Sequence, residues 1–132
     1  MKVLLLCGSH PRHEYLLRDL ISSYSEVHFS AFIMNREALI PPFPKQDSTP
    51  TKAQEILFAE HFRLRSKIER ETFGLDDVSI HKRKQNFSYQ HVAKDEINSV
   101  QFQKQISQLA ADICLVMGFG MLNADTLGVL PK

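Results

Sequence analysis

The sequence lacks any long apolar segment. No run of apolar residues approaches the roughly 20 needed to span a bilayer, and the run that follows Met1 and Lys2 is too short for a signal peptide. The 16 basic and 15 acidic residues leave a formal net charge of only +1, which favours neither nucleic acid nor an anionic membrane as a partner. These absences predict a cytoplasmic protein.

Cysteine is also scarce, and the two that occur, Cys7 and Cys114, both lie within apolar runs. A free thiol in such a run usually behaves as a small buried hydrophobic side chain, and reducing compartments disfavour disulfides. The sequence therefore predicts two buried thiols on adjacent central strands, with no disulfide between them.

Two motifs are missing from residues 8–13, which follow the first apolar run. This segment lacks the three spaced glycines with which dinucleotide folds bring pyrophosphate close to the backbone, and Pro11 removes an amide donor. His10 and His13 have no cysteine or carboxylate beside them in metal-binding register. We therefore expect neither a nicotinamide dehydrogenase nor a metal site.

What the sequence does contain is an alternation of short apolar runs and amphipathic segments. The apolar runs predict strands at residues 3–7, 27–34 and 111–117, with another at 78–81. Helices are predicted over residues 14–24 and 98–109, the second with Asn98 or Ser99 as its N-cap. Their expected inward-facing residues are Leu16, Leu17, Leu20, Ile21, Val100, Phe102, Ile106 and Leu109. The proline-rich residues 41–44 and the polar residues 81–86 are predicted loops.

The longest predicted helix begins with the start signal at residues 48–50 and ends at the stop signal Gly74. Its dense charges predict one solvated face with ion pairs such as that between Arg65 and Glu69. Its other face is expected to be buried through Ile56, Leu57, Leu64 and Ile68.

The order of these elements predicts the fold class. Buried strands separated by helical crossovers favour an α/β fold with a mainly parallel sheet. The expected strand order is the Rossmann-like 3-2-1-4. The length suits one domain, and we expect residues 1–132 to form a single domain.

Ligands of open α/β sheets bind outside the carboxyl ends of the strands, which here points to residues 8–13 and 118–123. Arg12 offers a fork of donors for a substrate phosphate or carboxylate. Gly118-Phe119-Gly120 offers a flexible backbone and an aromatic face that suit a flat heterocycle. A plain turn that closes the strand explains the same residues.

Residues 111–122, with Leu127 and Leu130-Pro131 after them, resemble the segment that precedes the active site of folate-dependent formyltransferases. Residues 61–74 and 95–99 are similar to the branch that includes sugar N-formyltransferases and methionyl-tRNA formyltransferase. The resemblance covers most of the chain. It implies a Rossmann-like fold in which residues 1–132 are the N-terminal part of the domain, incomplete at the C-terminal end. It also implies transfer of a formyl group from 10-formyltetrahydrofolate to an amine acceptor.

The resemblance implies one binding loop on this chain. It implies that the pterin of the donor contacts the side chains or backbone of Phe119, Gly120, Met121 and Leu122. The family's catalytic Asn-x-His motif and Asp are implied to follow Lys132, so no catalytic role passes to any of the six histidines, and the chain alone is expected to be inactive. The implied acceptor is a small-molecule or nucleotide-sugar amine, with aminoacyl-tRNA left open.

Two other functions stay open from the sequence. A Rossmann-like domain that binds a nucleotide or nucleotide sugar without group transfer would use Arg12 and the backbone of Gly8 and Ser9 to hold an anion. A non-catalytic interaction module would use the charged helix at residues 52–73 for assembly, for example into a homo-oligomer.

Overall fold

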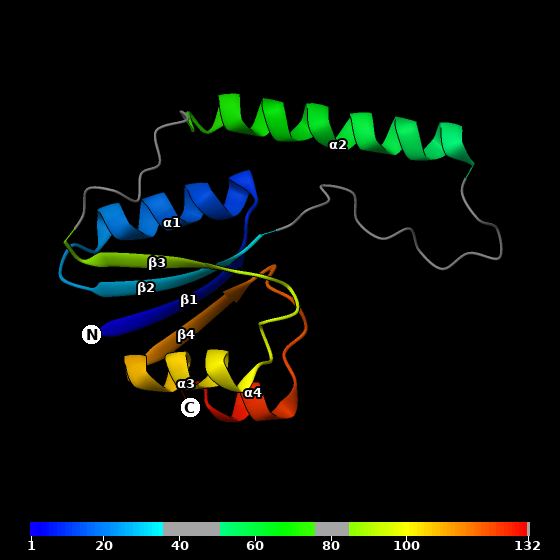
Figure 1. Cartoon of the computed structure of the whole chain (residues 1–132). Coiled ribbons are helices and arrows are strands. Elements are labelled where there is room, and N and C mark those ends of the chain that lie inside the picture. Colours follow the sequence, from blue (N-terminus) through cyan, green and yellow to red (C-terminus); the bar gives the residue numbers. More distant parts are fainter. Residues whose placement is uncertain (36–50, 76–84, 132) are drawn as a thin grey trace.

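A computed structural model describes residues 1–35, 51–75 and 85–131 of the chain. Within these residues the elements follow in the order β1 (Lys2–Gly8), α1 (Pro11–Ser23), β2 (His28–Met34), α2 (Lys52–Thr72), β3 (Phe87–Val92), α3 (Val100–Leu109), β4 (Ile113–Met117) and α4 (Ala124–Gly128) (Figure 1). The strands form one parallel sheet in the order β3-β2-β1-β4. The α/β class and the parallel sheet predicted from the sequence are therefore confirmed. The order also follows the predicted 3-2-1-4, but residues 87–92 form the third strand, which the sequence prediction placed at 78–81.

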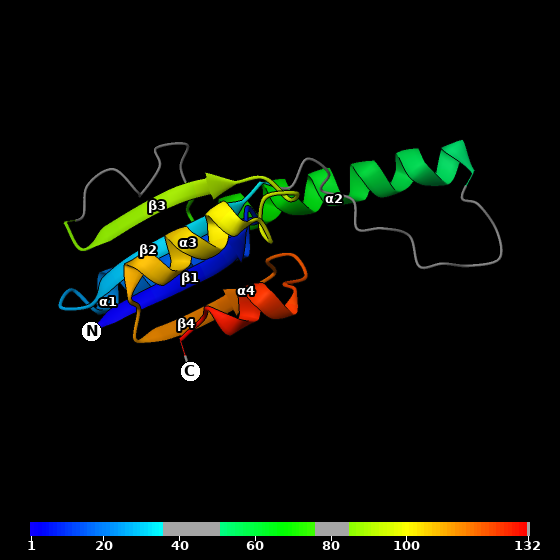
Figure 2. The same cartoon turned by 60° about the horizontal axis from the view of Figure 1, so that its bottom comes forward.

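The central strand β1 contributes side chains to two hydrophobic cores, because successive side chains of a strand point to opposite faces of the sheet. Helix α1 covers one face and α3 the other (Figures 1 and 2). The core beneath α1 includes Val3, Leu5, Cys7, Leu17 and Ile21. The core beneath α3 includes Leu4, Leu6, Phe32, Phe102 and Ile106. The apolar run at residues 3–7 is thus buried on both faces, as predicted.

The helices that cover the sheet begin at side-chain caps. His10 caps α1 by accepting a hydrogen bond from the Arg12 amide, and Ser99 caps α3 by accepting one from the Phe102 amide, which confirms one of the two caps predicted there. Two residues predicted to face inward do not, since Val100 is 66% exposed and Leu16 is 38% exposed. Both lie on the side of their helix that turns away from the sheet.

Strand β3 was missed by the sequence prediction. Its residues Ser88 to His91 are exposed, because the strand lies at the edge of the described sheet and, among the described strands, pairs with β2 alone. A polar edge strand lacks the continuous apolar run by which the buried strands were found. The predicted strand at 78–81, the proline-rich loop at 41–44 and the basic run at 82–84 lie outside the described residues.

The prediction that one face of helix α2 is buried is wrong. Ile56, Leu57, Leu64 and Ile68 were expected to be buried, yet each is at least half exposed, and no described residue of the helix is buried. The helix lies outside α1 instead of on the sheet, and its N-terminal part projects beyond the sheet (Figures 1 and 2). The described helix starts from a Thr51 cap, in a capping box with Gln54.

The prediction that Cys114 is buried on a central strand is also wrong, because of the position of β4. Cys7 and Cys114 do lie on adjacent strands, but β4 is an edge strand, so Cys7 is buried and Cys114 only partly so. Burial raises the pKa of both thiols to about 11. The apolar residues Ile113, Leu115 and Val116 are exposed for the same reason. Among the described residues, no helix has the length and apolar character needed to cross a membrane.

Candidate functional site

The carboxyl ends of β1 and β4 bring the two predicted ligand loops together. Cys7 pairs with Met117 in the parallel ladder, so residues 8–13 and 118–123 leave the sheet side by side. Gly118 contacts the His13 ring so closely that an added Cβ would lie 2.5 Å from His13 Cε1. This edge of the sheet is therefore the candidate functional site.

His13, in the first turn of α1, and Gly118 form the joint between the two segments. The distance from His13 Nδ1 to the Gly8 carbonyl oxygen is 2.9 Å, so Nδ1 carries the hydrogen and donates it, which leaves Nε2 as an acceptor in the neutral ring. Gly118 has a φ of +57°, a conformation that glycine adopts without steric cost. Any larger residue at 118 would meet both this backbone strain and the imidazole ring.

The four residues implied to bind the donor occupy different environments. Phe119 is only 7% exposed, and its ring stacks on Phe102 with centroids 5.9 Å apart. The aromatic face that the sequence offered to a flat heterocycle thus belongs to the core. Gly120 packs against Ile97, Leu122 is partly buried, and Met121 is 92% exposed.

Asn98 anchors this loop. Its side-chain nitrogen donates to the Met121 carbonyl oxygen at 3.0 Å, and its side-chain oxygen accepts from the Asn123 amide at 2.8 Å. Within the described residues, the backbone amides of Phe119 and Gly120 donate to no other group of the chain. The sequence suggested Asn98 only as a possible helix cap, since its partners lie more than 20 residues downstream.

A cluster of charged residues lies beside the joint. One oxygen of Glu69, Oε1, accepts hydrogen bonds from Arg12 Nε at 2.8 Å and from Arg65 Nε at 3.0 Å. The other oxygen, Oε2, is buried and has no hydrogen-bond partner among the described residues, although His10 Nδ1 lies 3.6 Å away. The predicted Arg65–Glu69 pair is confirmed. The predicted anion-binding Arg12 shares the same carboxylate, which no sequence pattern indicated.

The backbone of the first loop is already engaged. The Ser9 amide donates to the Met34 carbonyl and the His10 amide to the Gly8 carbonyl, while the Arg12 amide donates to the His10 ring. An anion bound by backbone needs amides that point at it. The backbone at Gly8 and Ser9 is therefore poorly suited to the anion binding that the nucleotide-binding alternative requires.

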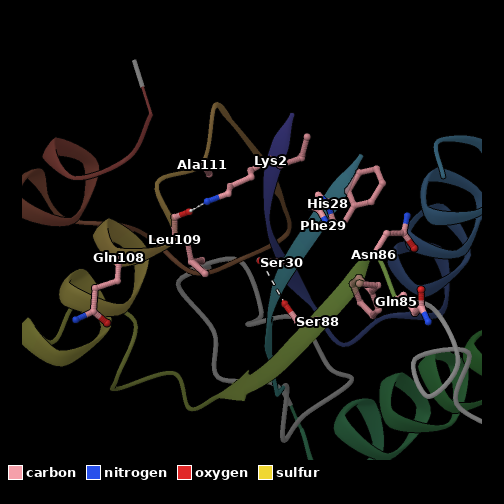
Figure 3. Close-up of a pocket in the computed structure, with 12 residues that line it drawn as sticks. Lys2, His28, Phe29, Ser30, Gln85, Asn86, Ser88, Gln108, Leu109 and Ala111 are labelled. Atoms are coloured by element: carbon pink, nitrogen blue, oxygen red, sulfur yellow. Dashed lines mark hydrogen bonds between the residues drawn. The ribbon is translucent and has the colours of Figure 1, made fainter. Parts of the chain in front are cut away.

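A cavity of about 360 Å³ lies at the opposite edge, by the amino ends of the strands. Figure 3 shows polar residues along it that bond to one another, with Lys2 Nζ donating to the Leu109 carbonyl and Ser30 bonded to Ser88. None of the residues predicted to bind a ligand lines it. We therefore place the site at the carboxyl ends of the strands.

The carboxyl edge thus combines an anchored loop with a pair of arginines on one carboxylate. The loop suits main-chain hydrogen bonds to a flat heterocycle, and the arginines suit an anion. Among the described residues, no group of three histidine, cysteine, aspartate or glutamate side chains is arranged to hold a metal ion.

Comparison with protein-family models, with curated proteins and with solved structures finds no match to the chain.

Proposed function

We propose that this chain forms the donor-binding, N-terminal part of a formyltransferase, which transfers a formyl group from 10-formyltetrahydrofolate to an amine acceptor. The resemblance of residues 111–122 to that family motivates the proposal. In it, Phe119, Gly120 and Met121 present their backbone to the pterin, and Leu122 fixes the loop to the core. The proposed location is the cytoplasm, where the two free thiols would stay reduced.

The observation that carries the proposal is the anchoring of the loop by Asn98. The side chain holds the Met121 carbonyl and the Asn123 amide, so the intervening and preceding backbone is fixed before a ligand arrives. Fixed polar groups bind with less loss of conformational entropy than mobile ones. The amides of Phe119 and Gly120, unbonded within the described chain, are then available to the ring edge of a pterin.

The part that this chain plays in the reaction is binding and orientation. Attack of an amine on the formyl carbonyl creates an oxyanion and releases a proton, so the reaction needs fixed hydrogen-bond donors and a base. The family's Asn-x-His motif performs that chemistry, and the 132-residue sequence contains no such motif. The chain alone is therefore expected to bind the donor weakly and to turn none of it over.

Binding of 5-formyltetrahydrofolate, a stable folate that carries a formyl group, tests the proposal. Amide chemical shifts of the labelled chain are followed during titration, and changes are expected at residues 118–123. Asn98→Ala removes both anchoring bonds and is expected to weaken binding about tenfold. Asn98→Asp keeps the acceptor for Asn123 but loses the donor to Met121, so an intermediate affinity is expected.

Asn86 provides the matched control for the Asn98 variants. Its side-chain nitrogen donates to the carbonyls of Tyr24 and Val27, so it also anchors a loop by two side-chain hydrogen bonds, but at the amino edge of the sheet. Asn86→Ala should leave folate affinity unchanged. Shift changes confined to the amino edge, or equal effects of the Asn86 and Asn98 variants, would contradict the proposal. Tighter binding of a nucleotide than of the folate would favour the nucleotide-binding alternative.

A further inference from the structure

The charged cluster around Glu69 has an unbalanced charge. Arg12 and Arg65 both bond to the single carboxylate of Glu69. The neighbouring ion pair of Arg70 with Glu14, at 3.3 Å, has no net charge and so does not change the net charge of the cluster. Among the described residues of this cluster, two guanidinium groups against one carboxylate leave a net charge of +1.

The two guanidinium groups lie side by side because they share one oxygen atom, Glu69 Oε1. Like charges held this close repel each other, and one carboxylate compensates only one of them. A second anion at the same place would remove the remaining repulsion. A purely structural arrangement of these two arginines would therefore need a second negative charge.

Each arginine keeps donors that Glu69 does not use. Arg65 bonds to the carboxylate through Nε alone, and Arg12 through Nε and one terminal nitrogen. Within the described residues, no other group accepts from the remaining guanidinium nitrogens. The side chains of Arg12 and Arg65 are 51% and 36% exposed, whereas Glu69 is only 14% exposed. The carboxylate thus lies beneath the arginines and positions them toward solvent.

The cluster is continuous with the anchored donor loop. The His10 and His13 rings lie with centroids 5.6 Å apart, His13 contacts Gly118, and His10 Nδ1 is 3.6 Å from Glu69. A ligand group held by the arginines would therefore lie near the place proposed for the pterin. That is where an acceptor of the formyl group has to be held.

We propose that Arg12 and Arg65, positioned by Glu69, bind a phosphate or diphosphate group of a small-molecule acceptor. Guanidinium groups match phosphate oxygens in pairs of parallel hydrogen bonds, and paired arginines provide more donors than one carboxylate of a ligand would use. This assignment of the acceptor as a phosphorylated amine rests on the proposed formyltransferase function. The anion site itself depends only on the cluster.

Inorganic pyrophosphate is the probe that tests the anion site, with binding measured by calorimetry on the whole chain. Arg12→Gln and Arg65→Gln are each expected to weaken binding about tenfold. Arg12→Lys keeps the charge but loses the planar fork, so a smaller loss is expected. Arg63→Gln is the matched control, because Arg63 lies on the same helix, is 68% exposed and pairs only with Glu60 among the described residues. It should change the affinity less than twofold.

The outcomes separate this proposal from the proposed function. Unchanged pyrophosphate affinity in both glutamine variants, with thermal unfolding showing that they are folded, would overturn the anion site. Equal affinity for malonate, a dicarboxylate, would overturn its assignment to phosphate. Pyrophosphate binding without binding of 5-formyltetrahydrofolate would leave the anion site standing and remove the formyltransferase. Folate binding without pyrophosphate binding would do the reverse.

Discussion

Helices α1 and α2 lie next to each other and are held in different ways. The shorter, α1, has 13 residues and buries Pro11, Leu17 and Ile21. The longer, α2, has 21 residues and buries none. Its C-terminal end is attached to α1 through polar groups and ring stacking, including the Arg12–Glu69 bond and the stacking of Tyr15 on Phe73.

The difference teaches what helical spacing of apolar residues can and cannot indicate. A periodic apolar stripe marks the face that a helix would bury, but burial needs a partner surface. The sheet has two faces, and α1 and α3 cover them. For α2, the described structure leaves only the outer side of α1 as a neighbour, where Arg12 and Tyr15 contact it. Its own half-buried residues, among them Arg65 and Glu69, match that side.

The largest expected effect compares a core leucine with an exposed one. Leu17→Ala should lower the free energy of unfolding by about 2 to 5 kcal/mol, because it leaves a cavity under α1. Leu64→Ala on α2 should change it by less than about 0.5 kcal/mol, because Leu64 is half exposed and both residues favour helix. Urea unfolding measures both. Similar losses would mean that α2 covers a core after all.

The next effect concerns the attachment of α2. Glu69→Gln weakens charge-assisted hydrogen bonds to Arg12 and Arg65, and a loss of about 1 to 3 kcal/mol in docking of the helix is expected. Hydrogen exchange should accelerate in α2 and stay unchanged in α1. Glu71→Gln is the control, since Glu71 is 66% exposed and pairs with Lys67 at 3.8 Å. Equal acceleration in both variants would argue against the role of Glu69.

Caps of the covered and uncovered helices provide a smaller contrast. Ser99→Ala removes the α3 cap and should lower global stability by about 1 kcal/mol, because α3 carries core residues. Thr51→Ala removes an equivalent cap from α2, and the same local cost should appear as fraying of its first turn while the global transition stays in place. A shift of the global unfolding midpoint by Thr51→Ala would contradict this.

A further effect extends the comparison to the strands. Burial raises the pKa of Cys7 and Cys114 from the ordinary 9.0 to about 11, so between these values the unfolded chain loses thiol protons that the folded chain keeps. Stability from these groups is therefore present below pH 9 and is lost as the pH rises toward 11. Cys7→Ala should reduce the slope of unfolding free energy in that window. An unchanged slope would contradict the burial of Cys7.

Labelling at pH 8 should also separate the two thiols. Cys7 is buried in the central strand, whereas Cys114 is partly exposed on the edge strand, so Cys114 should react first with a thiol reagent. Cys7 should react only when the chain opens. Equal, rapid labelling of both would show that β1 is not covered on both faces.

The sequence was most informative where burial is complete. The apolar run before Gly8 predicted β1, and the strand order followed from the alternation of strands and helices. The sequence was least informative at the edges of the sheet, because neither the polar residues of β3 nor the exposure of β4 produces a recognisable sequence pattern. The two ligand loops were predicted from fold geometry alone. The Asn98 anchor and the Arg12–Glu69 bond join residues 23 to 57 positions apart, and such pairings need three-dimensional coordinates.

The projecting part of α2 also affects how the chain diffuses. A compact protein of this length has a radius of gyration of about 14 Å. A helix attached near its C-terminal end extends the mass distribution along one axis, at about 1.5 Å for each residue beyond the attachment. Small-angle scattering should accordingly give a radius above the compact value, and rotational tumbling should be anisotropic. NMR relaxation rates of α2 amides would then depend on the direction of the helix axis as well as on local order.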